Sequence, residues 1–365
     1  MNAGNNLQST NLFIWVLAPY LETNDPDLEY YYDFTQSIAE YSRAFDLLKL
    51  DWKWQPVTID NYKTIIDDIE AVDNGKTTLI FNLCDGDEVN GTPGISVIHY
   101  LEEKKLHYTG ANAEFYRLTT SKIIMKKAFD ETGVSNANWI GITTPGHGMN
   151  GVCEKIGTPV IVKPAVSGGS MGLGIKNVVN TDEALKDIVG EIFKGYRGWD
   201  LAFGGIVAER FIAGPEYTSL IIGSYLHPEE AIIYPPVERI FHEALKEEEK
   251  FLSYDRLWET YHAENPVGEH EDFYNYHRPD PSLIDSINRL SWEAYVSVGG
   301  TGYGRIDIRM DKATGKLYVL EVNAQCGLSE DENYTSIGAI LRLANGSFAN
   351  MIAEIIQEAM RRAID

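Results

Sequence analysis

Two segments near the C-terminus alternate between polar and apolar residues, and they constrain the fold more than any other part of the chain. They span residues 303–310 and 316–323. Alternation with period two is typical of β-strands, because successive side chains point to opposite faces of a sheet. Residues 311–315 between them have the composition of a turn. The pattern predicts a β-hairpin, and pairing Met310 with Lys316 puts the odd-numbered residues of both strands on one face.

One face of this predicted hairpin gathers polar side chains. Arg305 and Asp307 come from the first strand, and Glu321 and Asn323 come from the second. Carboxylate and amide oxygens are hard ligands that suit Mg²⁺, which commonly also binds the phosphate oxygens of a nucleotide. The residues alone leave an alternative open, namely a solvated face with ordinary cross-strand ion pairs.

The composition of the 365-residue chain bounds its class. A hydrophobic fraction of 44% fits a folded globular protein, and a chain of this length is expected to form about two or three domains. A net charge of −23 without a basic cluster argues against nucleic acid or a membrane as partner. The cysteines Cys84, Cys153 and Cys326 are far apart, so neither a zinc site nor a disulfide framework is indicated. An apolar run at 12–18 is too short to span a membrane. Because the cysteines suggest a reducing compartment, a cytoplasmic protein is predicted.

Strands and helices alternate in the first 110 residues, which predicts a small parallel sheet. The expected elements there are strands at 12–18, 77–83 and 106–109 and helices at 31–48 and 95–104. Further helices are expected at 121–131, 182–193, 281–298 and 347–362, and strands at 159–163 and 206–211. The acidic and aromatic block 227–281 has few periodicities, which is typical of a functional lid or a disordered insertion.

A glycine-rich segment at 162–174 follows one of these strands. It lacks the Gly-Lys-Ser/Thr of a P-loop, and it does not open a helix as a dinucleotide-binding motif does. Because 175–179 reads as another strand, the glycines are expected in the bend of a hairpin. Glycine there lets consecutive N–H groups surround a phosphate, and Lys163 can supply positive charge. A flexible hairpin with a surface lysine is the alternative.

A third segment, at 207–216, reads as a strand that runs into a turn. Glu209 at the strand end can accept a hydrogen bond from an adenine amino group, the backbone of 210–212 can contact the purine edge, and Glu216 can bind ribose hydroxyls. An edge strand with two solvated acids is the alternative.

The order of these segments resembles one family. The motifs that carry the resemblance are Phe81-Asn82-Leu83, Asn90-Gly91-Thr92-Pro93-Gly94, Tyr108-Thr109-Gly110, Lys122, the glycine-rich segment, Glu209 to Glu216, Lys250, Gly304-Arg305-Ile306-Asp307 and Glu321-Val322-Asn323. From about residue 80 onward the chain resembles ATP-grasp enzymes, most closely the D-alanine–D-alanine ligase family. The resemblance implies an α/β protein with an N-terminal Rossmann-like parallel-sheet domain at 1–110. A two-subdomain α+β ATP-grasp fold would follow, at 111–209 and 210–365.

The resemblance also implies a site for ATP and two Mg²⁺ ions, with Mn²⁺ as an alternative metal. The implied nucleotide-binding residues are Lys122, Lys163, Gly168, Gly169, Ser170, Met171, Gly172, Glu209, Arg210, Phe211, Ile212 and Glu216. The implied metal ligands are Asp307, Glu321 and Asn323. Lys250 in the lid would reach the γ-phosphate, and Arg305 with the N–H of Gly327 would stabilise the oxyanion formed when an amine attacks an acyl phosphate.

The amino-acid half of the family pattern is altered. Gly169 and Phe251 stand where the family has a serine and a tyrosine close to the first D-alanine, and Glu22 is a candidate for its N-terminal glutamate. Where the family has a small hydroxyl for the second carboxylate, this chain has Ser329-Glu330-Asp331-Glu332-Asn333, acids that would attract a cation. A slipped local alignment is the alternative. Lid aromatics can enclose a larger substrate or pack the insertion; they are Tyr254, Trp258, Tyr261, Phe273, Tyr274 and Tyr276.

The sequence therefore predicts an ATP-dependent ligase that joins a carboxylate to an amine through an acyl phosphate. Its predicted substrates are amino acids or peptide-like molecules of specialised metabolism. The alternatives are a D-alanine–D-alanine ligase of peptidoglycan synthesis, an enzyme that extends the C-terminus of a peptide, and a non-catalytic ATP-binding regulator. The family resemblance further implies a homodimer.

Overall fold

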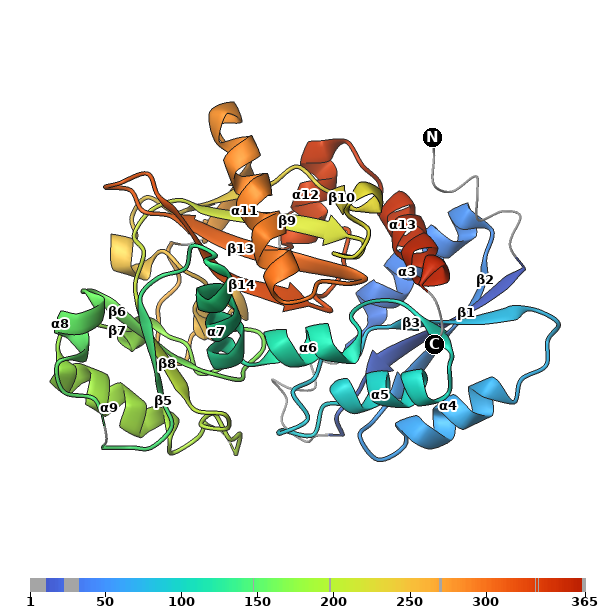
Figure 1. The fold of residues 1–365 in the computed structure, drawn as a ribbon, viewed down its shortest axis with the longest axis horizontal. Coiled ribbons are helices and arrows are strands. Elements are labelled where there is room, and N and C mark those ends of the chain that lie inside the picture. The colour runs from blue at the N-terminus through green and yellow to red at the C-terminus, as the bar shows by residue number, and fades with distance from the viewer. Residues whose placement is uncertain are drawn as a thin grey trace.

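A computed structural model describes residues 11–22, 33–146, 148–196, 198–268, 271–331, 333 and 335–362 of the chain. Three sheets organise these residues, and helices pack around them (Figure 1). No helix in these ranges is both long enough and apolar enough to cross a membrane.

The N-terminal sheet is fully parallel, with the strand order β2-β1-β3-β4. Its strands are β1 (Leu12–Pro19), β2 (Asp51–Val57), β3 (Thr77–Asn82) and β4 (His107–Tyr108), and its helices are α3 (Thr35–Leu48), α4 (Tyr62–Glu70) and α5 (Ile95–Glu103). The predicted parallel sheet is confirmed. Within the described residues the helix expected at 31–48 begins at Thr35, and 31–32 lie outside them. The sequence reading missed β2, whose alternate residues are only half-buried, and α4.

A second sheet is antiparallel, in the order β5-β8-β6-β7. Its strands are β5 (Trp139–Ile142), β6 (Val160–Pro164), β7 (Val178–Val179) and β8 (Ile206–Arg210). The helices that precede or accompany it are α6 (Ala113–Thr120), α7 (Lys122–Thr132), α8 (Val152–Ile156) and α9 (Asp182–Ile192). The strand expected at 175–179 is shorter than predicted, because Ile175–Asn177 forms a 3-10 turn and leaves only two residues to pair.

The third sheet is also antiparallel and has the order β12-β11-β9-β13-β14, with β10 beside β9. Its strands are β9 (Glu216–Ile222), β10 (Ile232–Ile233), β11 (Val237–Phe241), β12 (Tyr274–His277), β13 (Tyr303–Met310) and β14 (Leu317–Ala324). Three of them, β10, β11 and β12, fall within 227–281, so the described part of this block contributes strands to the sheet that were not expected from the sequence. Short helices in it are η2 (Pro228–Glu230), η3 (Glu247–Glu249) and α10 (Tyr254–Leu257).

The hairpin of β13 and β14 has a different register from the one expected. Met310 pairs with Leu317, and a bulge follows Asp307 so that Asp307 faces Glu321 and Arg305 faces Asn323. Without the bulge, odd residues of β13 would pair with even residues of β14, as Arg309 does with Tyr318. The extra residue therefore brings the four polar side chains onto one face.

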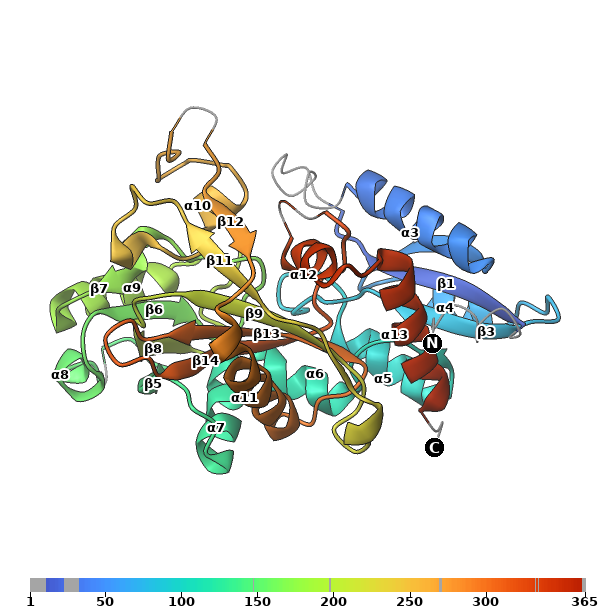
Figure 2. The same cartoon turned by 90° about the horizontal axis from the view of Figure 1, so that it is seen from above.

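The C-terminal helices join the third sheet to the first. They are α11 (Ile284–Ser297), which follows the turn η4 (Pro281–Leu283), α12 (Ser336–Ala344) and α13 (Phe348–Arg361). Helix α13 contacts α3, β4 and β9, and it runs between the N-terminal and third sheets in Figures 1 and 2. Its residues Ile352, Ile355 and Ile356 are fully buried in one cluster with Phe45 and Phe81. This apolar contact fixes the N-terminal loops relative to the hairpin face.

Candidate active site

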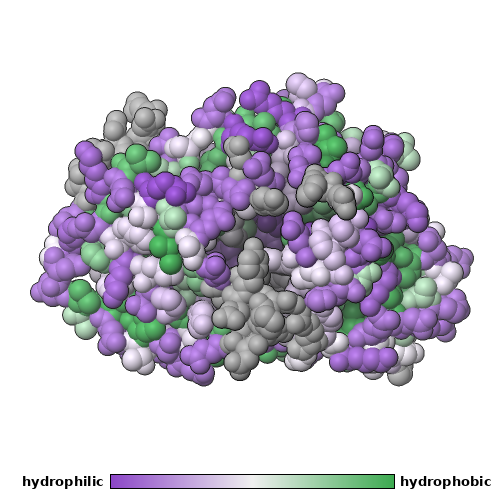
Figure 3. Space-filling view, turned by 180° about the vertical axis from the view of Figure 1, so that it is seen from behind, coloured by the Kyte–Doolittle hydropathy of each residue, from purple (hydrophilic) through white to green (hydrophobic). Residues whose placement is uncertain are grey.

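A cavity of about 1090 Å³ lies where the three sheets meet. The molecular surface is visibly hollowed near the centre of one face (Figure 3). Every residue of the predicted nucleotide, metal and oxyanion sites lines it except Gly172 and Lys250. The tertiary structure thus brings together segments that are far apart in the sequence.

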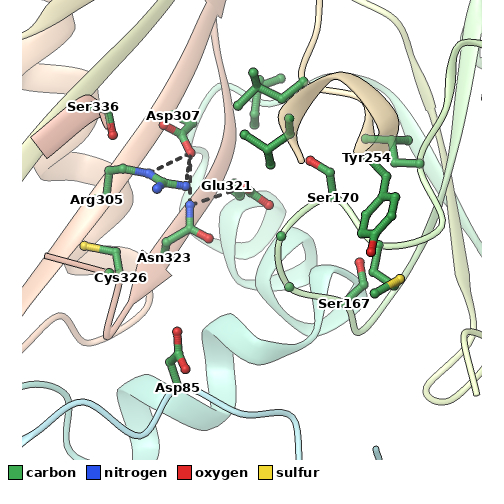
Figure 4. Close-up of a pocket in the computed structure, with 18 of the residues that line it drawn as sticks. Asp85, Ser167, Ser170, Tyr254, Arg305, Asp307, Glu321, Asn323, Cys326 and Ser336 are labelled. Atoms are coloured by element: carbon green, nitrogen blue, oxygen red, sulfur yellow. Dashed lines mark hydrogen bonds and ion pairs between the residues drawn. The ribbon is translucent and has the colours of Figure 1, made fainter. Parts of the chain in front are cut away.

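The hairpin face forms one wall of the cavity, and its polar side chains contact one another (Figure 4). Arg305 donates to Asp307 Oδ2 from Nε at 3.1 Å and from Nη2 at 2.9 Å. Asn323 Nδ2 donates to the same oxygen at 3.0 Å and to Glu321 Oε1 at 3.3 Å. Thr218, on the neighbouring strand β9, donates to Asp307 Oδ1 at 2.8 Å. Both amide hydrogens of Asn323 are engaged, so its Oδ1 is left to accept from or ligate a bound group.

The two carboxyl groups of this wall differ in their electrostatics. Burial, followed by the charge of nearby Glu321, raises the pKa of Asp307, and Arg305 opposes this. For Glu321 burial acts in the same direction, but the positive charges of Lys122 and Lys163 outweigh it and hold the pKa below its usual value. Two adjacent acids and an amide oxygen are a donor set that fits Mg²⁺, whose remaining ligands are commonly water and phosphate oxygens.

The glycine-rich turn forms the opposite wall. Gly169 and Ser170 both have positive φ, of 54° and 60°, and such tight turns can direct successive N–H groups toward an anion. Two predicted contacts are corrected. The N–H of Met171 is used within the turn, where it donates to Gly168 O at 3.0 Å. Gly172 packs toward Leu201, to which an added Cβ would come within 2.7 Å, and does not line the cavity.

Glu209 lies beneath this turn between two lysines. It is 2% exposed, its Oε1 is 2.6 Å from Lys163 Nζ, and its Oε2 is 2.5 Å from Lys126 Nζ. Although burial opposes ionisation, Lys126 and Lys163 lower the pKa of Glu209 to about 2. Lys122 lies one turn before Lys126 on α7, donates to Ser167 O at 3.3 Å and is 3.6 Å from Glu321.

Glu216 is held more tightly than the sequence suggested. Its Oε1 pairs with Arg239, and its Oε2 accepts from Arg309 Nε at 3.0 Å. All three side chains are buried, so Glu216 is no solvated acid of an edge strand. It still lines the cavity, next to Phe211 and Ile212.

Lys250 is the predicted catalytic residue that the structure does not bring to the cavity. Its Nζ lies 2.6 Å from Glu247 Oε1, and its carbonyl accepts a hydrogen bond from Arg309. Three residues of η3 precede it and turn its side chain toward their own carboxylates.

The two lost hydroxyls of the family pattern are not neighbours of a common group. Phe251 packs edge-on against Phe211, with ring centroids 6.1 Å apart. The side chain that covers Gly169 is instead Trp258, whose Nε1 donates to Gly169 O at 2.8 Å. A Cβ at Gly169 would lie 3.0 Å from the Trp258 ring, so the glycine and the tryptophan fit each other.

Within the acidic run after Asn323, Glu330 is directed away from the cavity. Glu330 forms an ion pair with Arg43 of α3, and its N–H donates to the buried Glu40 at 3.2 Å. Glu332 lies outside the described residues. The hydroxyl residues Thr335 and Ser336 line the cavity instead. The expectation of acids at the second-substrate position is therefore wrong for Glu330.

Asp85 is a cavity residue that sequence reasoning missed. It follows β3, and its carboxylate lies below the hairpin face in Figure 4. The side chain is open to the cavity, but surrounding protein desolvates it and, with Asp87, raises the pKa of Asp85 to about 6. Glu22, the candidate named from the sequence, does not line the cavity among the described residues. An acid two residues after the Phe81-Asn82-Leu83 motif was the available signal.

Comparison with known proteins shows the family of the chain. A family model described as "D-ala D-ala ligase C-terminus" matches residues 128–357. D-alanine–D-alanine ligase B of Xanthomonas campestris is 27% identical over 253 residues, 68% of this chain and 69% of that protein. The D-alanine–D-alanine ligase of Polynucleobacter asymbioticus is 25% identical over 266 residues, 71% and 68% of the two chains.

Solved structures show the same fold. D-alanine–D-alanine ligase from Bacillus anthracis complexed with ATP has a TM-score of 0.66 at 17% identity, over 96% of this chain and 97% of that chain. VanG D-Ala:D-Ser ligase from Enterococcus faecalis has a TM-score of 0.66 at 16% identity, over 96% and 100%.

Fold and site together define an ATP-grasp ligase. The chain belongs to the D-alanine–D-alanine ligase family, whose C-terminal model covers more than half of it. The alternative of a non-catalytic regulator is therefore not supported.

Proposed function

We propose that the protein joins the carboxylate of one amino acid to the amine of another through an acyl phosphate, releasing ADP and phosphate. One observation carries the proposal: Arg305, Asp307, Glu321 and Asn323 share a cavity with Lys163 and the glycine-rich turn. A carboxylate is a poor electrophile, so it must first be phosphorylated, and such transfer is catalysed by positioning and charge neutralisation.

In this scheme the nucleotide lies between the two walls. Its adenine binds against Phe211 and Ile212, with Glu209 accepting from the amino group and Glu216 from the ribose. Lys122, Lys163 and the amides of Gly168, Gly169 and Ser170 hold the phosphates. Asp307, Glu321 and Asn323 hold Mg²⁺, which when bound neutralises phosphate charge. The N–H of Gly327 and the guanidinium of Arg305 stabilise the oxyanion that forms as the amine attacks.

Lys250 needs a change of side-chain rotamer to take part, because its ammonium now lies on Glu247. A γ-phosphate carries more negative charge than a single carboxylate and competes with Glu247 for it. We propose that nucleotide binding releases Lys250 from this ion pair.

Asp85 is proposed to bind the amino group of the first substrate. Among the described residues no cationic side chain pairs with Asp85, and an unpaired carboxylate in a cavity attracts a cation. Glu22 was only a candidate for this role in the sequence. An α-amino acid supplies both the cation for Asp85 and the carboxylate for phosphorylation.

Two substrate proposals remain, and D-alanine is the first to test. The curated relatives are named D-alanine–D-alanine ligases, and Ser336 supplies a hydroxyl in the cavity that can bind a second carboxylate. Trp258 over Gly169 favours the specialised ligase, because it replaces a small polar group with a large ring.

Phosphate release from ATP distinguishes them. Purified protein is assayed with D-alanine alone and with single and paired L- and D-amino acids, and products are identified by mass spectrometry. Turnover with D-alanine alone at a rate of about 1 s⁻¹ or more is ordinary for an enzyme. It would support a D-alanine–D-alanine ligase of peptidoglycan synthesis and exclude a ligase of specialised metabolism. Turnover only with other pairs does the reverse, and no turnover with any pair contradicts the proposed ligation. We further propose a cytoplasmic homodimer that binds neither nucleic acid nor membranes, which light scattering and fractionation test.

A further inference from the structure

The buried Lys126 has no role in the proposed catalytic scheme. Lys126 is 1% exposed, and its ammonium lies 2.5 Å from Glu209 Oε2. It does not line the cavity. Among the described residues no other acid pairs with it, and removing an ammonium ion from water is costly unless a close ion pair offsets the loss.

The second oxygen of Glu209 binds a lysine of a different kind. Lys163 Nζ lies 2.6 Å from Oε1, yet Lys163 lines the cavity and its side chain is 16% exposed. On the paired strands Lys163 sits opposite Val207, two residues from Glu209 and on the same face. A triphosphate in the cavity therefore competes with Glu209 for Lys163.

This competition changes the charge balance around Glu209. If Lys163 moves to a phosphate, Glu209 keeps its buried position and loses one of its two cations. A buried carboxylate without a cation takes up a proton. A protonated Glu209 donates one hydrogen bond and is a poorer acceptor for an adenine amino group.

The two cations that lower the pKa of Glu209 come from different elements. Lys126 approaches from α7 and Lys163 from β6. On β5, the other neighbour of β8, the residue opposite Glu209 is Trp139, which is uncharged. Lys126 is thus the cation that remains when Lys163 leaves.

We propose that Lys126 is a positioning residue that keeps Glu209 ionised while Lys163 transfers to the nucleotide. Glu209 can then accept a hydrogen bond from the adenine amino group. This inference rests on the proposed function. Glu209 exchanges one cation for a hydrogen-bond donor, and no net proton enters the site when ATP binds.

Calorimetric titration with Mg·ATP and Mg·ITP tests it, in two buffers of different ionisation enthalpy at pH 6.5. ITP has a carbonyl where ATP has the amino group. In Lys126→Met the ATP affinity is expected to fall about tenfold, a loss of about 1.4 kcal/mol. Binding should take up close to one proton, and the ATP-to-ITP preference should shrink because a protonated Glu209 can donate to the ITP carbonyl.

Three controls isolate the charge. Lys126→Arg should show no proton uptake, and neither should Lys127→Met, which removes the exposed neighbouring lysine. If Lys126→Met unfolds, Lys126→Gln gives the same readouts because it can hydrogen-bond Glu209 without a charge. The contrary outcome is a variant that folds with a lower melting temperature, takes up no proton and keeps the same ratio of ATP to ITP affinity. That result would mean that the Lys126–Glu209 pair is merely structural, and it overturns the inference. Failure of the natural protein to bind ATP overturns the proposed function instead.

Discussion

Arg305 acts at the scale of a single residue on two groups at once. Its guanidinium donates two hydrogen bonds to Asp307, and Arg305 lines the same cavity as Gly327. Only an arginine provides both a fixed fork for a carboxylate and a permanent charge for an oxyanion.

Replacing Arg305 by alanine is expected to lower kcat by about 10²- to 10³-fold, as the loss of one oxyanion donor does in other enzymes. The KM for ATP should change only a few-fold, because Lys122, Lys163 and the glycine-rich turn remain. Steady-state kinetics measures both. Arg289→Ala, an exposed arginine on α11, is the matched control and should behave as the natural protein. Equal losses in ATP binding and turnover would contradict the role given to Arg305.

Asp85 gives a pH dependence whose sign follows from its pKa of about 6. Its charge is present above that pH, so the KM for the first amino acid should rise as the pH falls through 6. In Asp85→Asn the KM should be about tenfold or more higher at pH 8 and nearly independent of pH. Initial rates between pH 5 and 8 measure this, and a parallel pH profile in both proteins would exclude Asp85 as the amine-binding residue.

The same carboxyl makes a prediction for stability. The folded pKa lies above the ordinary value of 3.8, so the folded state binds more protons between pH 3.8 and 6 and loses stability as the pH rises through that window. Asp85→Asn mimics the protonated form. Its melting temperature should exceed that of the natural protein at pH 8 and match it near pH 4, as calorimetry can determine.

At the scale of elements, the lid and the glycine-rich turn form one unit. Trp258 donates to Gly169 O at 2.8 Å, Tyr254 N–H donates to Leu173 O at 2.8 Å, and Glu264 accepts from Ile175 N–H at 2.8 Å. The turn that would hold phosphate is therefore covered by residues about eighty to ninety positions later in the sequence. Figure 4 shows Tyr254 next to Ser167 and Ser170.

The substitution Gly169→Ser tests whether the glycine-rich turn depends on its contact with the lid. A side chain at φ 54° is strained, and its Cβ would press on the Trp258 ring at 3.0 Å, which together disfavour the closed turn by about 1–2 kcal/mol. The KM for ATP should rise about five- to thirtyfold, and the tryptophan fluorescence should change. Adding Trp258→Ala relieves the contact but not the backbone strain, so it should restore part of the affinity. No change in either readout would show that the turn does not depend on this contact.

At the scale of the whole molecule, α13 determines where the N-terminal sheet lies. Its isoleucines are buried against α3 and β3 in the same cluster as residues of α12 and β9. Asp85 and the hairpin wall face one cavity because this packing holds the first and third sheets together.

Ile356→Ala should therefore lower the free energy of unfolding by about 2–5 kcal/mol, as cavity-forming substitutions do. Urea denaturation measures it. The exposed Arg361→Ala, which breaks one surface ion pair with Glu230, should cost less than about 1 kcal/mol. Similar losses in the two variants would mean that α13 is not a central packing element.

The sequence by itself determined many of the local elements, the family and the residue types proposed for the site. Period-two alternation gave β13 and β14, βαβ order gave the parallel sheet, and the motif order gave the ATP-grasp ligase. These features are short in range or depend only on order along the chain, so they can be read without coordinates. The division into three domains at 110 and 209 stays a prediction.

Only the tertiary structure decided which side chains meet. The bulge after Asp307 set the hairpin register, and an ion pair with Glu247 turned Lys250 from the cavity. Likewise, an ion pair with Arg43 on α3 directs Glu330 away from the cavity, and the packing of α7 buries Lys126 against Glu209. Each outcome depends on a partner many residues distant or on one extra residue in a strand. The energy of such contacts is a property of the folded chain, and no local pattern encodes it.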